Sequence, residues 1–319
     1  MKETYSRSKS VWQRMNARER KAAMAYGEKY KAFLDTARTE RLAAAEIIRR
    51  AEEKGFKPVY TMKSLKAGDK VYWNQKDKSV ILAVIGKEPV HEGIKIVGSH
   101  IDSPRLDLKA NPVHEQDGIV YFRTHYYGGI KKYQWTCIPL ALIGVVFTKD
   151  GKKVDINIGL KDSDPVFYVS DLLIHMAQDQ MKKTLAEGIT GEQLQAVAGT
   201  HSEEGQTPKD AIMALLKKEY GIEEEDFAAA ELELVPATKS RDVGFDRSLI
   251  ASYGQDDRVC SYANLEAILD AKPGVKAQAA LLTDKEEIGS YGNTGMESSY
   301  FVKFVMKLLA LQGQGSLLD

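Results

Sequence analysis

The stretch GIKIVGSHID, residues 93–102, decides how the rest of the chain is interpreted. Its first half, GIKIV at residues 93–97, is a short apolar run, which is typical of a buried central strand. Its second half turns polar and brings His100 and Asp102 to the point where that strand ends. Enzymes with an α/β core place their chemistry at the ends of such strands. We therefore expect an α/β core with a functional site here.

Patterns on both sides of this stretch alternate between helix and strand. Thr39 is a plausible N-cap for a helix that Gly55 ends. The expected helices cover residues 16–36, 39–54, 258–271 and 299–311, and the expected strands cover 70–73, 79–85 and 277–282. Charged residues and periodic apolar positions in the helices indicate that they pack on a sheet made by the strands.

The middle of the chain has mainly strand-like patterns. Strand-like runs follow each other with few helical patterns between them, over residues 119–123, 140–148, 153–158 and 229–235. Helices are expected only over 171–181 and 208–220, on either side of a polar, loop-like segment at about 188–205. Short strands joined by turns such as Asp150-Gly151 favour an antiparallel unit. We therefore expect an α/β domain, residues 1–105 and 241–319, interrupted by a mainly β insertion, residues 106–240.

Composition restricts the classes of function. Lys and Arg together number 45, as do Asp and Glu, so no global basic field exists to hold nucleic acid or an anionic membrane surface. The N-terminus has no apolar signal core, and no run of about 18 apolar residues is present. We expect a cytoplasmic protein without a membrane span. Cys137 and Cys260 form no CxxC motif and are expected to be free, buried thiols.

Three clusters can carry chemistry, and each has a plainer alternative. His100 can offer one ring nitrogen to a metal while Asp102, two residues on, holds the other nitrogen. The alternative is a surface histidine with a capping aspartate. In QDDR, residues 255–258, a carboxylate at a helix start gains from the helix N-terminus and can bridge two cations; the alternative is an ordinary N-cap.

The third cluster is TDKEEIGSYG, residues 283–292, where Glu286 and Glu287 leave a buried strand and enter a glycine loop. Neighbouring side chains there point in different directions, so one can bind a metal while the other accepts a proton from water. The alternative is a solvated acidic turn. Together the three clusters supply the N and O ligands that zinc accepts, from separate elements of one core.

Four ordered motifs resemble those of the aspartyl aminopeptidase and aminopeptidase I family in its bacterial form. They are VGSHIDSPRLDLKANP at 97–112, THYYGGIKKYQW at 124–135, QDDR at 255–258 and TDKEEIGSYG at 283–292. Their order, their spacing and the large insertion all resemble the family from about Tyr30 onward. The resemblance implies a three-layer zinc-peptidase catalytic domain, whose C-terminal part is absent here, and a dimerisation domain in the insertion.

The resemblance also implies a role for individual residues. His100 is similar to a ligand of one zinc, Asp256 to the carboxylate that bridges two zincs ahead of a cis peptide, and Glu287 to a ligand of the second zinc. Asp102 is similar to the partner that orients His100, and Glu286 to the general base. His175 is similar to a substrate-binding histidine that reaches the neighbouring subunit's active site; the alternative is a packed helix histidine.

The implied function is a metalloaminopeptidase that removes acidic or neutral N-terminal residues from peptides with two zinc ions. Glu286 would take a proton from water and pass it to the leaving amine. Cobalt or manganese can replace zinc at such ligands. The implied assembly is a homo-oligomer, a dimer building block of a larger particle, with peptides as its substrates.

Two expected ligands of the family pattern, an aspartate and a histidine, find no match after Glu287. We therefore expect weak metal binding, little activity and an exposed strand edge in the chain as given. One alternative function is a non-catalytic assembly or regulatory subunit. Another is a different two-metal hydrolase, such as a deacylase.

Overall fold

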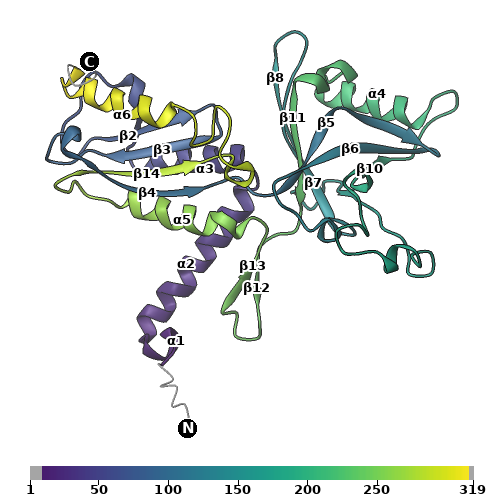
Figure 1. The fold of residues 1–319 in the computed structure, drawn as a ribbon, viewed down its shortest axis with the longest axis horizontal. Helices are drawn as coiled ribbons and strands as arrows, with labels where there is room; N and C mark the ends of the chain where they lie inside the picture. Colours follow the sequence, from purple (N-terminus) through teal and green to yellow (C-terminus); the bar gives the residue numbers. More distant parts are fainter. Residues whose placement is uncertain (1–8, 316–319) are drawn as a thin grey trace.

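The structure is a computed structural model that describes residues 9–315, and its strands form two large sheets and a short hairpin (Figure 1). The first sheet has the strand order β1-β2-β3-β14-β4. Their bounds are Lys57–Pro58, Lys70–Gln75, Ser79–Val84, Ala277–Thr283 and Ile94–His100. Strand β14 pairs antiparallel with β3 and parallel with β4. It therefore lies between two strands from the first third of the chain.

Helices cover both faces of this sheet, as expected for three layers. All six residues of β3 are buried, and its side chains alternate between the two faces. Val80, Leu82 and Val84 share a core with α2, α3 and α5, whereas Ile81 and Ala83 share one with α6. The helices are α1 Val11–Arg14, α2 Ala17–Thr36, α3 Glu40–Glu53, α5 Gln255–Leu269 and α6 Tyr300–Leu311. Thr39 caps α3 as predicted, because its hydroxyl accepts the Leu42 amide proton at 3.3 Å.

The second sheet is antiparallel and closes on itself. Its order is β11-β5-β6-β10-β9-β7-β8, and β11 pairs with β7 as well as with β5. The strands in chain order are Arg105–Gln116, Ile119–Tyr127, Pro139–Phe147, Lys153–Ile158, Phe167–Tyr168, Ala196–Gly199 and Ala230–Pro236. Helix α4, Pro208–Tyr220, packs on its core through Leu216 and has the predicted bounds.

The predicted helix over residues 171–181 is wrong. This segment consists of turns followed by a 3-10 turn at Gln180–Lys182. Leu173 and Met176 are each 70% exposed, so their apolar spacing meets no neighbouring surface in the described residues. Amphipathic helices of this length take most of their stability from such a surface, which explains why the periodic pattern was misleading.

The apolar run at residues 93–97 also lies elsewhere than predicted. It forms β4 at an edge of the first sheet, where β14 is its only neighbour among the described strands. Ile96 and Val97 are 46% and 45% exposed. An apolar run signals a strand that can be covered on both faces, but it does not report how many strands pair with it. The expected exposed strand edge is therefore β4.

Residues 101–104 connect the two sheets, and a hairpin of β12, Arg241–Val243, and β13, Leu249–Ala251, follows the second one. The side chain of Phe245 at the hairpin tip is fully exposed. Cys137 and Cys260 are free, as predicted, but exposed rather than buried, because they lie in a turn and on the outer face of α5. No helix within residues 9–315 is long and apolar enough to cross a membrane.

Candidate metal centre

Three elements bring the predicted residues together at one end of the first sheet. His100 is the last residue of β4, and it pairs in register with Thr283, the last residue of β14. The 3-10 turn Glu286–Ile288 therefore begins three residues beyond the position beside His100. Helix α5 packs against β4 and brings Asp256 from its first turn. Neighbouring parallel strands thus place a histidine and two glutamates at the same edge.

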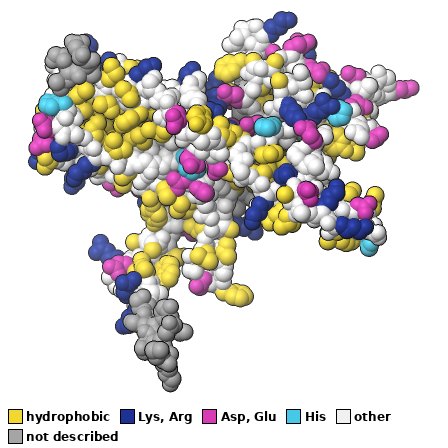
Figure 2. Space-filling view, in the orientation of Figure 1, with side chains coloured by type: hydrophobic (Ala, Val, Ile, Leu, Met, Phe, Trp, Pro, Cys, Tyr) yellow, Lys and Arg dark blue, Asp and Glu magenta, His cyan; other side chains and the backbone are white. Residues whose placement is uncertain are grey.

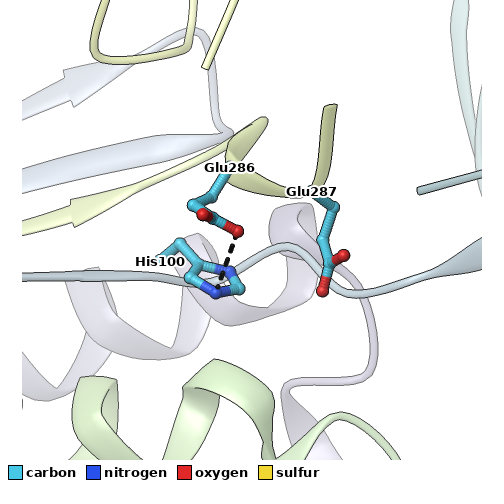
Figure 3. Close-up of side chains that lie close together, drawn as sticks. All are labelled: His100, Glu286 and Glu287. Carbon is cyan, nitrogen blue, oxygen red and sulfur yellow. Dashed lines mark ion pairs between the residues drawn. The ribbon is translucent and has the colours of Figure 1, made fainter. Parts of the chain in front are cut away.

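Three of the side chains form a compact N/O cluster (Figure 3). Ligand atoms of His100, Glu286 and Glu287 all lie within 4.8 Å of one another. His100 Nε2 lies 3.5 Å from Glu286 Oε2 and 3.5 Å from Asp256 Oδ1. The Asp256 side chain is 90% exposed and that of Glu286 is 57% exposed, so the cluster opens to solvent. Figure 2 shows acidic side chains gathered beside a histidine between the two lobes of the molecule.

Asp102 lies behind the cluster and orients the imidazole. His100 Nδ1 is 3.1 Å from the Asp102 carbonyl oxygen and 3.3 Å from its carboxylate. With Nδ1 held in this way, Nε2 faces Glu286 and Asp256. Tyr127 donates its hydroxyl proton to the Asp102 carboxylate at 2.7 Å. The predicted pairing of His100 and Asp102 therefore exists, and the expected cis peptide joins Asp256 and Asp257.

Burial and neighbouring charges shift the pKa values of three side chains at the cluster. Burial opposes protonation of His100, but the hydrogen bond to Asp102 and the Asp102 charge outweigh it and raise the His100 pKa to about 9. Burial would raise the pKa of Asp102, but hydrogen bonds from His100 and Tyr127 hold it below its usual value. Burial and the charge of Asp102 raise the pKa of Glu287. A divalent cation would relieve this crowding of carboxylates.

The residues present fit a zinc ion. One imidazole nitrogen and several carboxylate oxygens converge, and zinc accepts both donor types. Asp102 holds the non-coordinating nitrogen of His100, an arrangement that zinc-bound histidines usually show. Asp256 approaches His100 from helix α5, although it does not belong to the compact cluster of His100, Glu286 and Glu287.

Other candidate residues lie apart from this centre. His175 is exposed in the turns that follow β9, on the second sheet unit, and not in the cluster around His100. His125 is exposed on β6 and stacks on Tyr126 with ring centroids 5.6 Å apart. Neither histidine therefore contacts the cluster around His100 in the described chain.

Two contacts from the second sheet to the cluster were not predicted from the sequence. One is the hydrogen bond from Tyr127 to Asp102. The other is the approach of Gly128 to Glu287: Gly128 has φ +75°, and a Cβ built on it would lie 3.1 Å from Glu287 Cβ. The Tyr-Gly-Gly sequence at a strand end signals a turn, but which residue the turn approaches depends on the pairing of distant strands.

Comparison with known proteins identifies the group of enzymes that this chain resembles. The family profile described as Aminopeptidase I zinc metalloprotease (M18) matches residues 33–319. A probable M18 family aminopeptidase 1 of Clostridium acetobutylicum is 46% identical over 313 residues, which are 96% of this chain and 67% of that protein. The crystal structure of an M18 family aminopeptidase from Thermotoga maritima superposes with a TM-score of 0.91 at 41% identity, over 96% of this chain and 67% of that one.

A more distant structure shares the fold. The mApe1 dodecamer of S. cerevisiae is 17% identical, with a TM-score of 0.71, over 91% of this chain and 67% of that one.

Proposed function

Because the chain belongs to the M18 family of aminopeptidase I zinc metalloproteases, we propose that His100, Asp256 and Glu287 hold two zinc ions in its active site. The observation that carries this proposal is the convergence of His100, Glu286 and Glu287 within 4.8 Å at the end of β4 and β14, with Asp256 3.5 Å from the same histidine. His100 would hold one ion, Glu287 would hold the other, and Asp256 would serve both.

Bound zinc supplies Lewis acidity, which polarises a carbonyl group and lowers the pKa of water. Glu286 accepts a proton from the attacking water and passes it to the leaving amine. Its carboxylate suits this task because it is more than half exposed and lies beside His100. Asp102 keeps the Nε2 lone pair of His100 directed at the metal side of the ring. The reaction removes one acidic or neutral residue at a time from a peptide N-terminus.

The same residues suggest how strongly the 319-residue chain holds metal. Each zinc receives two of the proposed protein groups, His100 with Asp256 or Asp256 with Glu287. Zinc in proteins usually takes about four ligands. We infer that these 319 residues bind zinc weakly and turn over slowly by themselves.

The second sheet unit supports a proposal about assembly. Leu173, Ile174 and Met176 are between 62% and 70% exposed around His175. Exposed apolar side chains in one segment are typical of surfaces that bind another protein. We propose that this segment lies against a second copy of the chain and that His175 contributes to substrate binding there. The division into residues 1–105, 106–240 and 241–319 stays a prediction.

A matched pair of variants tests the separate roles of the two glutamates. Glu286→Gln and Glu287→Gln are adjacent and equal in size. Zinc affinity, followed by competition with a chromophoric chelator, should be unchanged in Glu286→Gln and lower in Glu287→Gln. Cleavage of aminoacyl p-nitroanilides should fall about 10²–10⁴-fold in Glu286→Gln. Equal loss of zinc in both variants would contradict the assignment of Glu286 as the base.

A further inference from the structure

The hydroxyl of Tyr127 is the point at which the second sheet reaches the metal centre. Tyr127 is the last residue of β6, and it donates a 2.7 Å hydrogen bond to Oδ2 of Asp102. Tyr127 is 7% exposed and Asp102 is fully buried. A buried hydrogen bond to a charged carboxylate is short and strong, and it fixes the rotation of the acceptor. Tyr127 therefore determines which way the Asp102 carboxylate faces.

The Asp102 carboxylate in turn contacts both catalytic segments of the first sheet. Its Oδ1 lies 3.3 Å from His100 Nδ1 and accepts the Glu286 amide proton at 3.2 Å. Its Oδ2 accepts the Glu287 amide proton at 3.2 Å. One carboxylate thus orients the imidazole of His100 and also anchors the backbone of the Glu286–Glu287 turn. A rotation of this group would disturb both segments at once.

The ring of Tyr127 is itself held from the second sheet. Arg105 and Tyr127 are paired residues on β5 and β6. The guanidinium carbon of Arg105 lies 3.8 Å from the centroid of the Tyr127 ring, a close cation–π contact. Arg105 also forms an ion pair with Asp107 at 2.8 Å, and its Nε lies 3.4 Å from Glu233. The hydroxyl of Tyr127 therefore approaches Asp102 from a rigid support.

We propose that Tyr127 is a positioning residue of the metal centre, which acts through Asp102 to orient His100 and the Glu286–Glu287 turn. The inserted sheet thereby takes part in building the site. This inference rests on the proposed function for its catalytic meaning, but the positioning contact itself is defined by geometry alone.

Tyr127→Phe removes only the hydroxyl and keeps the ring over Arg105. Groups that orient metal-bound histidines change metal affinity by about 10–100-fold when they are replaced, and Tyr127 is one contact further out. We expect zinc affinity to fall by about tenfold, the lower end of that range. In a crystal structure of the variant, the Asp102 carboxylate should have rotated away from the Glu287 amide. Tyr121→Phe is the matched control, since Tyr121 lies on β6 roughly 20 Å from Tyr127.

A double-variant cycle separates positioning from a general structural effect. If Tyr127 acts through Asp102, adding Tyr127→Phe to Asp102→Asn should produce no further loss of zinc affinity. Additive losses in the double variant would overturn the proposal. So would an unchanged zinc affinity in Tyr127→Phe, or an unmoved Asp102 carboxylate in its crystal structure.

The zinc assignment can fail independently of the positioning role of Tyr127. If the parent chain took up no zinc, or if His100→Ala took up as much as the parent, the zinc assignment would fail. The crystal structures of parent and Tyr127→Phe would still decide the positioning role, because the Asp102 carboxylate rotates or stays without reference to metal.

Discussion

Replacing Arg105 by methionine should destabilise the protein more than any single surface charge can. Arg105 is 5% exposed and lies between two buried carboxylates. Its Nη1 lies 3.3 Å from Glu40 of α3, and its Nε lies 3.4 Å from Glu233 of β11. The arginine therefore joins the first sheet unit to the second in a region that excludes water. Methionine fills a similar volume but carries no charge.

The magnitude follows from the state of the two glutamates. Burial would raise the pKa of Glu40, but the charges of Arg105 and Lys78 hold it well below its usual range, so Glu40 is ionised. Burial raises the pKa of Glu233 well above its usual range despite the charge of Arg105. Removing Arg105 leaves Glu40 with Lys78, at 3.2 Å, as its remaining cation. Breaking a buried ion pair from one side costs about 3–5 kcal/mol.

The loss should depend on pH with a defined sign. In the parent, the lowered pKa of Glu40 contributes stability above its ordinary value of 4.5, and this contribution is lost as pH falls through the lower folded-state pKa. Without Arg105, burial is less well compensated and the Glu40 pKa rises. The difference in unfolding free energy between parent and variant should therefore be largest at neutral pH and shrink below pH 4.5.

Urea unfolding followed by tryptophan fluorescence measures this difference, because Trp73 lies in the first sheet and Trp135 beside the second. Arg49→Met is the control: its ion pairs with Glu46 and Glu53 are on the surface, so we expect little effect. Adding Glu40→Gln to Arg105→Met should recover most of the loss. The reasoning would be refuted if Arg105→Met were as stable as Arg49→Met, or if Glu40→Gln recovered nothing.

Three further predictions concern other parts of the structure. Gly128→Ala should lose about 1–2 kcal/mol of stability, seen by urea unfolding, because of its positive φ, and should weaken zinc binding because the new Cβ presses on Glu287. Burial and the charge of Glu40 raise the Asp284 pKa to about 6, so Asp284 weakens the fold as pH rises from 3.8 to about 6. Asp284→Asn should remove up to about 3 kcal/mol of that pH-dependent loss, and an unaltered pH profile of urea unfolding would argue against it. Val97→Lys on the edge strand β4 should reduce concentration-dependent light scattering without lowering stability.

Local sequence signals predicted much of the fold because they depend on neighbouring residues. Thr39 and Gly55 mark the ends of α3, and helix α4 has the predicted bounds, since caps and stops act within one turn. The proximity of His100, Glu286 and Glu287 was also expected, because each residue lies within five residues of the end of a predicted strand. Such signals say where an element ends and which side chains are available there.

What depended on distant partners was not predictable in the same way. The segment around Met176 has helical spacing but no surface to pack on, and the strand at Ile96 is an edge strand. The contact of Tyr127 with Asp102 requires β5 and β6 to pair and the second sheet to turn back toward the first. Pairing between strands is set by the whole hydrophobic core, so a pattern in one strand does not reveal its neighbour.

The central claim is that zinc binds at His100, and the most direct test is a zinc titration of three proteins by isothermal calorimetry at pH 7.5. These are the parent chain, His100→Ala, and His91→Ala as a control for an exposed histidine outside the site. The account predicts zinc binding in the parent, equal binding in His91→Ala and strongly reduced binding in His100→Ala. Equal zinc binding in all three proteins would contradict it.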